Sequence, residues 1–308
     1  MSIRFEASTL PAPTPRSSLR WSKYRSRTIA LLFLLPAVLV FGMFLWYPIY
    51  LGFRISFVQF DLVRDPVFVG WDNYRTILKD PLLGKTVLNT LKYMLYGLAI
   101  GYLLPVVIAI WIAEMRRFQN VFRLAVYMPA ILPGIAIYTL WRWMFEPQGL
   151  LNSWLGAVGL GPVPWITSEV WSMFSMVLMD TWAGFGSTAI LYIAALGAVS
   201  EEIYEAAEID GAGVWCRILH ITIPGIKNVM LVLLVLQLIG TAQAFQSMFV
   251  VTEGGPFNST LTVLFLIYRY AFVNFQFGPA AALGTLFFLV LAALSGAYLA
   301  LSRKKEGA

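Results

Sequence analysis

Six long apolar runs constrain the fold of this chain more than any other feature of its sequence. They cover about residues 29–52, 87–112, 121–142, 170–196, 225–248 and 278–301. A helix needs about 20 mostly apolar residues to cross the hydrocarbon core of a membrane, whereas the strands of a membrane β-barrel alternate over about ten. The runs have the length and continuity of helices. The sequence therefore predicts an all-α integral membrane protein with six transmembrane helices over 29–301.

The composition also favours a membrane protein. The 308 residues are 59% hydrophobic and 12% charged, whereas a soluble domain carries about 25% charged residues. So few charges could not cover a surface exposed to water. Residues 1–28 are rich in Pro, Ser and Arg, and the apolar run after them is longer than the roughly 7–15-residue core of a signal peptide. We therefore interpret 1–28 as a basic tail and 302–308 as a second tail.

The distribution of Lys and Arg predicts the orientation of the helices, because membrane proteins carry an excess of these residues on the cytoplasmic side. With the N-terminus inside, fourteen of the 22 Lys and Arg residues lie in cytoplasmic segments, and eight lie outside or near outer helix ends. We therefore expect both termini in the cytoplasm. The same orientation places the segment 201–224, between the fourth and fifth runs, in the cytoplasm.

The segment 201–224, EEIYEAAEIDGAGVWCRILHITIP, concentrates acidic and small residues between two apolar runs. Ser200 is a suitable N-cap for a short helix. Within that helix, Glu201, Glu205 and Glu208 follow the spacing of one helical face. The beginning of the segment therefore predicts a short helix with an acidic face.

The end of this segment predicts a turn and a second helix. Gly211 can take the left-handed conformation that ends a helix. A second short helix is expected over about 212–222, and Pro224 suits the first turn of the next spanning helix. We therefore expect a helical elbow on the cytoplasmic face, with a solvated acidic loop as the alternative.

The segment resembles the EAA loop of permease subunits of binding-protein-dependent ABC importers. That loop reads Glu-Ala-Ala, three residues, Gly, nine residues, Ile, one residue, Leu-Pro; this chain matches it from Glu205 to Pro224, with Ile223 where Leu is usual. The resemblance implies the type I importer fold, with a cytoplasmic coupling helix that seats in a cleft of an ATP-hydrolysing subunit. It assigns to this coupling Glu201, Glu202, Glu205, Ala206, Ala207, Glu208, Asp210, Gly211 and Pro224. The acids would then form a docking surface for a partner of complementary charge.

Three further stretches resemble the carbohydrate branch of these permeases, and most closely the first permease of the maltose and glycerol-phosphate pairs. They are FVGWDNYRTILKDP before the second run, YMPAILPGIAIYTLWRWMF through the third and VTEGGPFNSTLTVLFLIYRYAFVNFQFGPAAALG into the sixth. The resemblance thus covers most of the chain. It implies a subunit of an ATP-driven sugar importer that forms half of the translocation pathway.

Asp180 is the one charge in the fourth apolar run. An ionisable group at membrane depth is costly and usually faces a cavity or a partner. Two roles are therefore open for Asp180, a pathway residue or a structural hydrogen bond to a neighbouring helix. The resemblance implies a sugar cavity lined by Asp180, Trp182 and Phe185, although relatives often have Asn at the first of these positions. It also implies a second wall formed by Thr241, Gln243, Phe245 and Gln246.

The same resemblance implies the partners and the location of the chain. The partners are a homologous second permease, two ATP-binding subunits and an extracytoplasmic solute-binding protein, and the location is a bacterial or archaeal cytoplasmic (inner) membrane. ATP and Mg would be bound by the ATPase, and this chain would hold no cofactor. Gly84-Lys85-Thr86 has the last residues of an ATP-binding phosphate loop, but that motif also requires Gly at the position of Lys79. The chain is therefore not expected to bind ATP itself. The single histidine, His220, excludes a multi-histidine metal site.

Other functions stay open at this point. Within the same class, the solute could be glycerol phosphate, a polyamine or another small molecule, but a phosphate would require basic residues in the middle of runs four and five, which have none. From other classes, the chain could be an integral membrane enzyme or a scaffold. The loop 253–260 is expected to help receive the binding protein, and 261–277 is expected to be an interfacial or partly buried helix.

Overall fold

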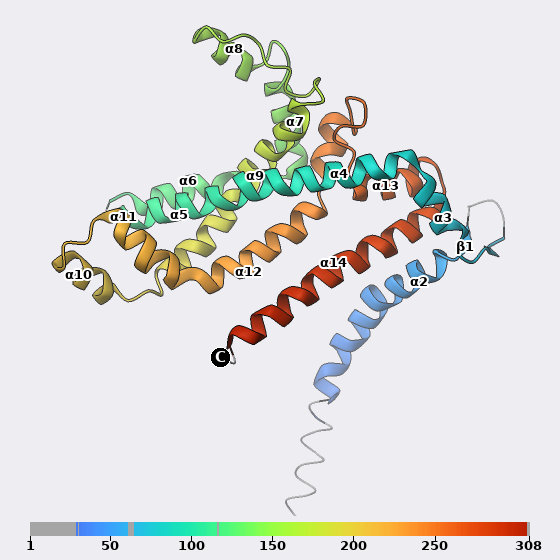
Figure 1. Ribbon diagram of the computed structural model, residues 1–308, viewed down its shortest axis with the longest axis horizontal. Helices are drawn as coiled ribbons and strands as arrows, with labels where there is room; N and C mark the ends of the chain where they lie inside the picture. Colours follow the sequence, from blue (N-terminus) through green and yellow to red (C-terminus); the bar gives the residue numbers. More distant parts are fainter. Residues whose placement is uncertain (1–28, 30, 61–64, 116, 307–308) are drawn as a thin grey trace, which may run out of the picture. The chain divides into compact units, whose positions relative to one another are not determined.

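The computed structural model describes residues 29, 31–60, 65–115 and 117–306. The chain forms two units, Met1–Arg54 and Ile55–Ala308. One antiparallel pair of two-residue strands, β1 (Val58–Gln59) and β2 (Val67–Phe68), accompanies a set of helices (Figure 1). The predicted all-α class is confirmed. The predicted tail 1–28 lies outside the described residues. The predicted tail 302–308 is wrong in its start, because α14 (Phe277–Glu306) continues through residue 306, and only 307–308 lie outside the described residues.

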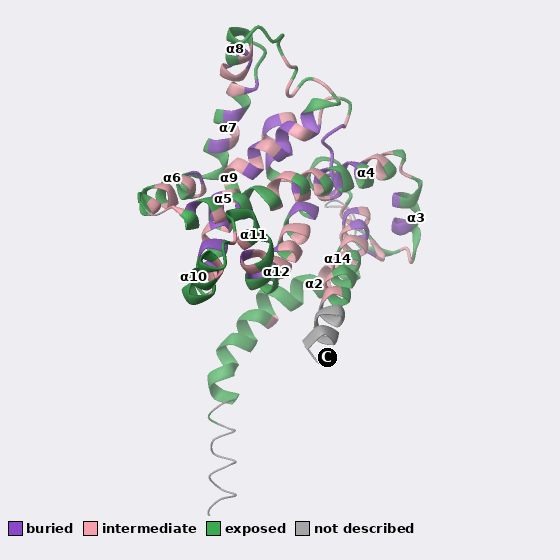
Figure 2. Cartoon of the chain, turned by 60° about the vertical axis from the view of Figure 1, so that its left-hand side comes forward, coloured by how far each residue is buried: buried purple, intermediate pink, exposed green. Residues whose placement is uncertain are grey.

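The first unit contributes one apolar helix, Leu31–Ile55, whose last residue already belongs to the second unit. It contains a π-helical turn, η1 (Gly42–Trp46), followed by α2 (Tyr47–Ile55). Its most apolar window has a mean hydropathy of 2.1, and no residue of that window is buried. Figure 2 colours most of α2 green, for exposed residues. A helix so apolar and so exposed requires lipid or another protein chain around it.

Four helices of the second unit are also long and apolar enough to cross a membrane. They are Pro81–Glu114, α9 (Trp171–Leu196), Val214–Ala242 and Phe277–Tyr298, the last being the apolar part of α14 (Phe277–Glu306). With the helix of the first unit, the described residues contain five such helices, or six if a bent pair counts as one span. These helices correspond to the apolar runs of the sequence.

The helix Pro81–Glu114 consists of α4 (Pro81–Tyr96), the π-helical η2 (Gly97–Tyr102) and α5 (Leu103–Glu114). It begins where the Asp80 carboxylate accepts a hydrogen bond of 2.8 Å from the backbone N–H of Leu82. The π-helical turn η2 immediately precedes α5, which contains Pro105. A proline has no N–H for the carbonyl one turn earlier and its ring crowds that carbonyl, so a wider turn relieves the clash.

The third apolar run differs from the single span expected over 121–142. It forms α6 (Gln119–Ile131) and α7 (Gly134–Met144), which meet at an angle of 94°. The break lies at Leu132, whose backbone is extended, with φ −72° and ψ 142°. Leu132 precedes Pro133, and a residue before proline is pushed out of the helical conformation. The bend therefore follows from the local sequence.

Two apolar cores hold the second unit together. The larger contains Ile77, Met176, Met248 and Leu261, all fully buried. The second packs α5, α9 and α12 (Ile223–Ala242) around residues such as Tyr192. Figure 2 shows these buried residues in purple within the helical bundle.

Short helices connect the long ones. They are α3 (Asp72–Lys79), α8 (Leu150–Ala157), α10 (Glu201–Ile209), η4 (Met248–Thr252), α13 (Val263–Tyr268) and η5 (Arg269–Val273). The segment 261–277, expected to be a partly buried helix, contains α13 and η5, which pack against α14. Val263, Phe265 and Leu266 of α13 are buried.

Candidate functional site

A polar centre lies among the membrane helices at Asp180 on α9. Its Oδ2 atom accepts a hydrogen bond of 2.6 Å from the hydroxyl of Tyr93 on α4 and another of 2.6 Å from the hydroxyl of Ser247. Both donors are buried residues. The carboxylate therefore joins three segments that are far apart in the sequence.

A cavity of about 320 Å³ lies on one side of this centre. Its wall includes the phenols of Tyr93 and Tyr138 and the Asp180 carboxylate. The wall also includes the segment 243–247, which lies between the end of α12 and the start of η4. Backbone and side-chain amides, two phenols and an aromatic ring thus surround one space.

A smaller cavity of about 120 Å³ shares Tyr93 and Asp180 with the first and extends between η2, α9 and α12. Gln237 donates to the carbonyl of Gly97 at 3.3 Å across it. Glycine at 101 leaves room for this side chain, because a Cβ atom there would lie 2.8 Å from Nε2 of Gln237, and a Cβ atom at Gly97 would lie 2.7 Å from Cγ2 of Thr241. The small cavity is therefore closely packed where η2 approaches α12.

Most of the pathway residues suggested by the resemblance border these two cavities. Those on the cavity walls are Asp180, Phe185, Thr241, Gln243, Phe245 and Gln246. Trp182 lines neither, because its ring packs edge-on against Trp141 at a centroid distance of 5.6 Å in the larger apolar core. Gln243, Phe245 and Gln246 lie beyond the end of α12 and not on a continuing fifth helix.

Sequence reasoning missed Tyr93 and Tyr138, which both border the larger cavity. A tyrosine within an apolar run does not by itself indicate a cavity residue, because its ring packs equally well in a core. Tyr93 comes from α4, a helix to which the resemblance assigned no pathway residue. Its role becomes visible only when the fold brings it to Asp180.

The elbow predicted over 201–224 has the expected beginning and turn. α10 starts after Ser200, whose backbone is extended but whose side chain makes no capping hydrogen bond. The helix ends before Gly211, which has φ +76°. An L-residue with a side chain is strained at that angle, so glycine is required there.

The second short helix expected over 212–222 is instead the first part of a long one. α11 (Val214–Arg217), η3 (Ile218–Thr222) and α12 follow one another without a break, giving a 29-residue helix over Val214–Ala242. Pro224 is the second residue of α12, but since η3 precedes α12 without a break it lies inside the long helix, where the wider π-helical turn of η3 accommodates the missing N–H. The elbow and the fifth span therefore share one continuous helix.

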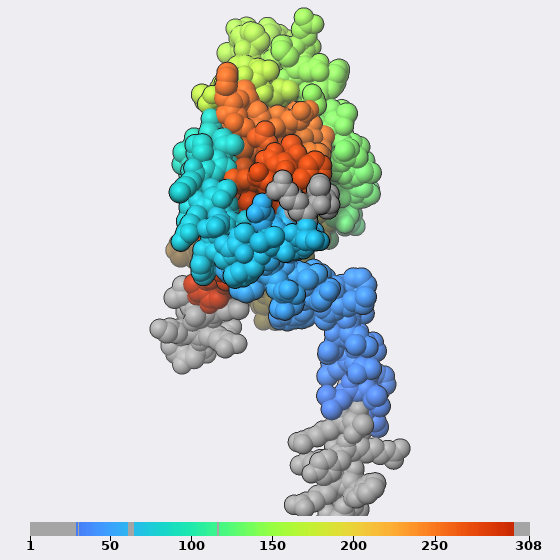
Figure 3. Space-filling view, turned by 90° about the vertical axis from the view of Figure 1, so that its right-hand side faces the viewer, coloured from blue at the N-terminus to red at the C-terminus, as the bar shows by residue number. Residues whose placement is uncertain are grey.

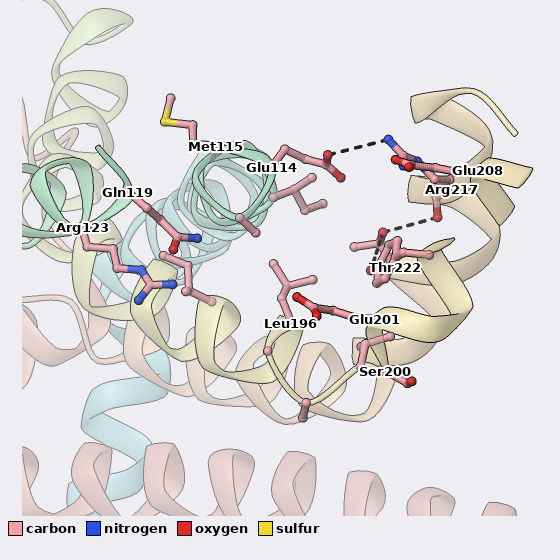
Figure 4. Close-up of a pocket in the computed structure, with 17 residues that line it drawn as sticks. Glu114, Met115, Gln119, Arg123, Leu196, Ser200, Glu201, Glu208, Arg217 and Thr222 are labelled. Carbon is pink, nitrogen blue, oxygen red and sulfur yellow. Dashed lines mark hydrogen bonds and ion pairs between the residues drawn. The ribbon is translucent and has the colours of Figure 1, made fainter. Parts of the chain in front are cut away.

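The surface of the elbow is both acidic and apolar. Glu208 forms an ion pair with Arg217, so its charge is compensated within the chain. Figure 4 shows these two side chains facing Glu114 at the end of α5. Ile209 and Trp215, on either side of the Gly211 turn, are 87% and 77% exposed. A docking surface here would thus combine apolar side chains with the remaining acids.

At the other end of the second unit, the turn 253–260 is fixed by α4. Asn89 donates hydrogen bonds of 2.8 and 2.9 Å to the carbonyls of Asn258 and Leu261. Lys85 lies within α4 and donates to the carbonyl of Phe257 at 2.6 Å, so the Gly84-Lys85-Thr86 motif has no loop geometry. Figure 3 shows the orange surface of this region beside the cyan surface of α4.

A second contact ties this region to the beginning of α4. The hydroxyl of Tyr270 on η5 donates a hydrogen bond to the Asp80 carboxylate. Burial, reinforced by this bond, raises the pKa of Tyr270, so that the hydroxyl stays a donor. Among the residues described, no three or more His, Cys, Asp or Glu side chains gather as a metal site.

The sequence of this chain is similar to those of known transport proteins. The family model described as "Binding-protein-dependent transport system inner membrane component" matches residues 101–307. The arabinooligosaccharides transport system permease protein AraP of Bacillus subtilis (strain 168) is 32% identical over 97% of this chain and 96% of its own length. The lactose transport system permease protein LacF of Rhizobium radiobacter is 31% identical, over 92% and 96%.

The fold is also similar to a solved structure. A chain of a bacterial ABC transporter involved in the import of the acidic polysaccharide alginate superimposes with a TM-score of 0.81. The match covers 92% of this chain and 98% of the other at 24% sequence identity. This likeness confirms the expected importer permease fold.

Proposed function

This chain belongs to the family of binding-protein-dependent transport system inner membrane components, and on that basis we propose that it forms half of the membrane pathway of an ATP-driven sugar importer. The observation that carries the proposal is the cavity of about 320 Å³ at Asp180. It lies among the membrane helices, and its wall includes a carboxylate, side-chain amides, phenols and an aromatic ring. The proteins AraP and LacF, named for arabinooligosaccharide and lactose transport, support the sugar class.

The chemistry of the cavity suits a neutral polyol. Gln243 and Gln246 offer both donors and acceptors, and Asp180 offers acceptors, for hydroxyl groups. The ring of Phe245 supplies an apolar face for the C–H side of a sugar ring. No Lys or Arg is among the described residues lining the two cavities. A phosphate would require such a cation, so the walls favour a sugar over glycerol phosphate.

The partners follow from the same proposal. A soluble binding protein outside delivers the sugar, a homologous second permease completes the pathway, and two ATPase subunits bind ATP and Mg. Both termini lie in the cytoplasm, where the elbow 201–224 docks in an ATPase cleft. The chain itself carries out no hydrolysis.

The helix Val214–Ala242 supplies a physical route for this coupling. Its 29 residues extend for about 43 Å at 1.5 Å per residue. One end is part of the elbow, and the other ends at Gln243 on the cavity wall. Movement of the ATPase against the elbow would therefore be transmitted to the cavity by one continuous helix.

The coupling part of the proposal is tested by purification of the chain from native membranes. Wild type is expected to bring down an ATPase and a second permease, and Gly211→Asp is expected to lose the ATPase alone. Gly159→Asp is the matched control, because Gly159 has a similar φ of +78° with equally open space but lies in the loop after α8. If wild type retains no ATPase, or if both variants lose it equally, the docking role of the elbow is wrong.

The sugar part is tested with the importer and its binding protein in proteoliposomes. ATPase stimulation and uptake are compared for an arabinooligosaccharide, lactose, glycerol 3-phosphate and spermidine. We expect stimulation by a sugar, and a raised KM for it in Gln243→Leu but not in Gln276→Leu, an exposed residue outside both cavities. Stimulation by the phosphate or the polyamine alone would overturn the sugar assignment.

A further inference from the structure

Arg217 occupies an unusual position at the base of the elbow. Its side chain is 12% exposed and forms an ion pair with Glu208 of α10. Its Nη2 atom also lies 3.9 Å from Oε2 of Glu114, the last residue of α5. Figure 4 shows Arg217 between these two carboxylates. One largely enclosed guanidinium therefore contacts two acids from different elements.

α10 depends on such polar contacts for its position. None of its residues is buried. A cavity of about 680 Å³ lies between the elbow and the adjoining ends of α5 and α9, so apolar packing is sparse on that side. The hydroxyl of Tyr204 on α10 donates to Thr222 at 3.0 Å, which ties α10 to η3 as the Arg217–Glu208 pair ties it to α11. These two contacts join α10 to the base of the helix Val214–Ala242.

The contact with Glu114 reaches a different span. Glu114 ends the helix Pro81–Glu114, and the same helix carries Tyr93, which bonds Asp180 at the cavities. Arg217 belongs to the helix Val214–Ala242, which ends beside Gln243 on the cavity wall. The pair Arg217–Glu114 thus connects the inner ends of two helices that both reach the cavity. The Arg217 side chain is largely enclosed whereas that of Glu114 is 41% exposed, so salt screens this pair only in part.

We propose that Arg217 is a positioning residue that makes the elbow move these two helices together. The proposal rests on the function proposed above, since it requires an ATPase that moves the elbow. With Arg217 in place, displacement of α10 pulls on Glu114 and on the helix Val214–Ala242 at once. Without it, the displacement reaches one cavity wall alone, and ATP is hydrolysed without an equivalent rearrangement of the pathway.

The experiment measures sugar molecules taken up per ATP hydrolysed in proteoliposomes that contain the complete importer and its loaded binding protein. Arg217→Met keeps much of the side-chain volume and removes the charge. We expect its assembly with the ATPase to be retained and its uptake per ATP to fall about fivefold, in the range by which residues between two sites change their coupling. Arg217→Lys, which keeps the charge, should recover part of the ratio, a rescue that a purely steric role would not give.

A second variant separates the connection from the folding of the elbow. Glu114→Gln leaves the Arg217–Glu208 pair intact and weakens the contact to α5, so uptake per ATP should again fall while assembly stays normal. Wild-type uptake per ATP in Arg217→Met would overturn the proposal. Normal uptake per ATP in Glu114→Gln would also overturn it, even if Arg217→Met failed to assemble. If wild type itself assembles with no ATPase or imports no sugar, the function proposed above fails instead.

Discussion

The hydroxyl of Tyr93 on α4 and the carboxylate of Asp180 on α9 form a hydrogen bond of 2.6 Å at the boundary of two cavities. Ser247 donates to the same oxygen atom from the segment between α12 and η4. The sequence left two roles open for Asp180, and the structural hydrogen bond is present. The carboxylate also borders both cavities, so contact with a solute is compatible with that bond.

Replacing Asp180 should separate the two roles. In Asp180→Ala the buried hydroxyls of Tyr93 and Ser247 lose their acceptor, and the free energy of unfolding should fall by about 1–3 kcal/mol. Asp180→Asn keeps an acceptor oxygen and should lose less. The melting temperature of the purified protein and sugar uptake are measured together. Equal melting temperatures for wild type and Asp180→Ala would show that the hydrogen bonds contribute nothing to stability.

Gly186 should be intolerant of even one methyl group. A Cβ atom there would lie 2.0 Å from the carbonyl oxygen of Val126, a backbone atom of α6 that no side-chain rotation can move. Gly186→Ala must push α6 and α9 apart, and we expect a loss of about 1–3 kcal/mol or more. The measurement is the melting temperature in detergent.

The matched control for this substitution lies two residues earlier on the same helix. Gly184 has no atom within 4 Å of its ideal Cβ position. Gly184→Ala should be neutral or stabilising by up to about 1 kcal/mol, because alanine favours a helix interior. Equal losses in the two variants would contradict the close approach of α6 and α9.

The long helices could be predicted because lipid imposes a simple requirement on them. A run of about 20 apolar residues is visible without knowledge of any contact. The 94° bend between α6 and α7 was not predicted, since apolar residues continue across it and the break depends on one proline, Pro133. The continuity of Val214–Ala242 was also missed, because Gly213 and Pro224 suggested separate elements, whereas the π-helical turn η3 runs directly into α12 before Pro224.

Part of the candidate site could also be predicted from the sequence, because a polar residue stands out in an apolar run. Asp180 is conspicuous as a lone charge in an apolar run, and the resemblance pointed to the residues around Gln243. Its partners Tyr93 and Ser247 are 87 and 67 residues away. Ser247 stands out as a polar residue in the fifth apolar run, but no local pattern shows that either residue bonds to Asp180. Likewise, the acidic face of the elbow was evident, but the pairing of Glu208 with Arg217 was not, because it depends on the turn at Gly211.

The turn 253–260 should depend on Asn89 for its shape. This side chain is buried and donates to two backbone carbonyls of the turn region, at Asn258 and Leu261. Asn89→Ala removes both bonds, and we expect a loss of about 1–3 kcal/mol with faster proteolysis of the turn. Lys85→Met, which removes one exposed hydrogen bond to Phe257, should change stability by less than about 0.5 kcal/mol. A proteolysis rate unchanged by Asn89→Ala would show that the turn is held by its own internal contacts.

The apolar side chains of the elbow should contribute more to ATPase binding than its acids. Trp215 is 77% exposed and Ile209 is 87% exposed, so neither stabilises the isolated chain appreciably, whereas burial of such side chains at an interface is strongly favourable. We expect Trp215→Ser to weaken ATPase binding by about 30-fold, the equivalent of about 2 kcal/mol, with an unchanged melting temperature. Ile209→Ser should act in the same direction. Because Glu208 is already paired with Arg217, Glu208→Gln should cost less than either.

Trp154 on α8 supplies the control for these variants. It is 59% exposed, and its helix belongs to the loop between α7 and α9, which the proposed orientation places outside the membrane. Trp154→Ser removes an exposed indole without touching the elbow, and ATPase binding should match wild type. Binding is measured by titration of the purified ATPase onto the permease pair in nanodiscs. If Trp154→Ser weakens it as much as Trp215→Ser, the loss reflects a general effect on the protein. If Trp215→Ser binds normally while charge reversal at Glu205 abolishes binding, the acids and not the apolar side chains carry the contact.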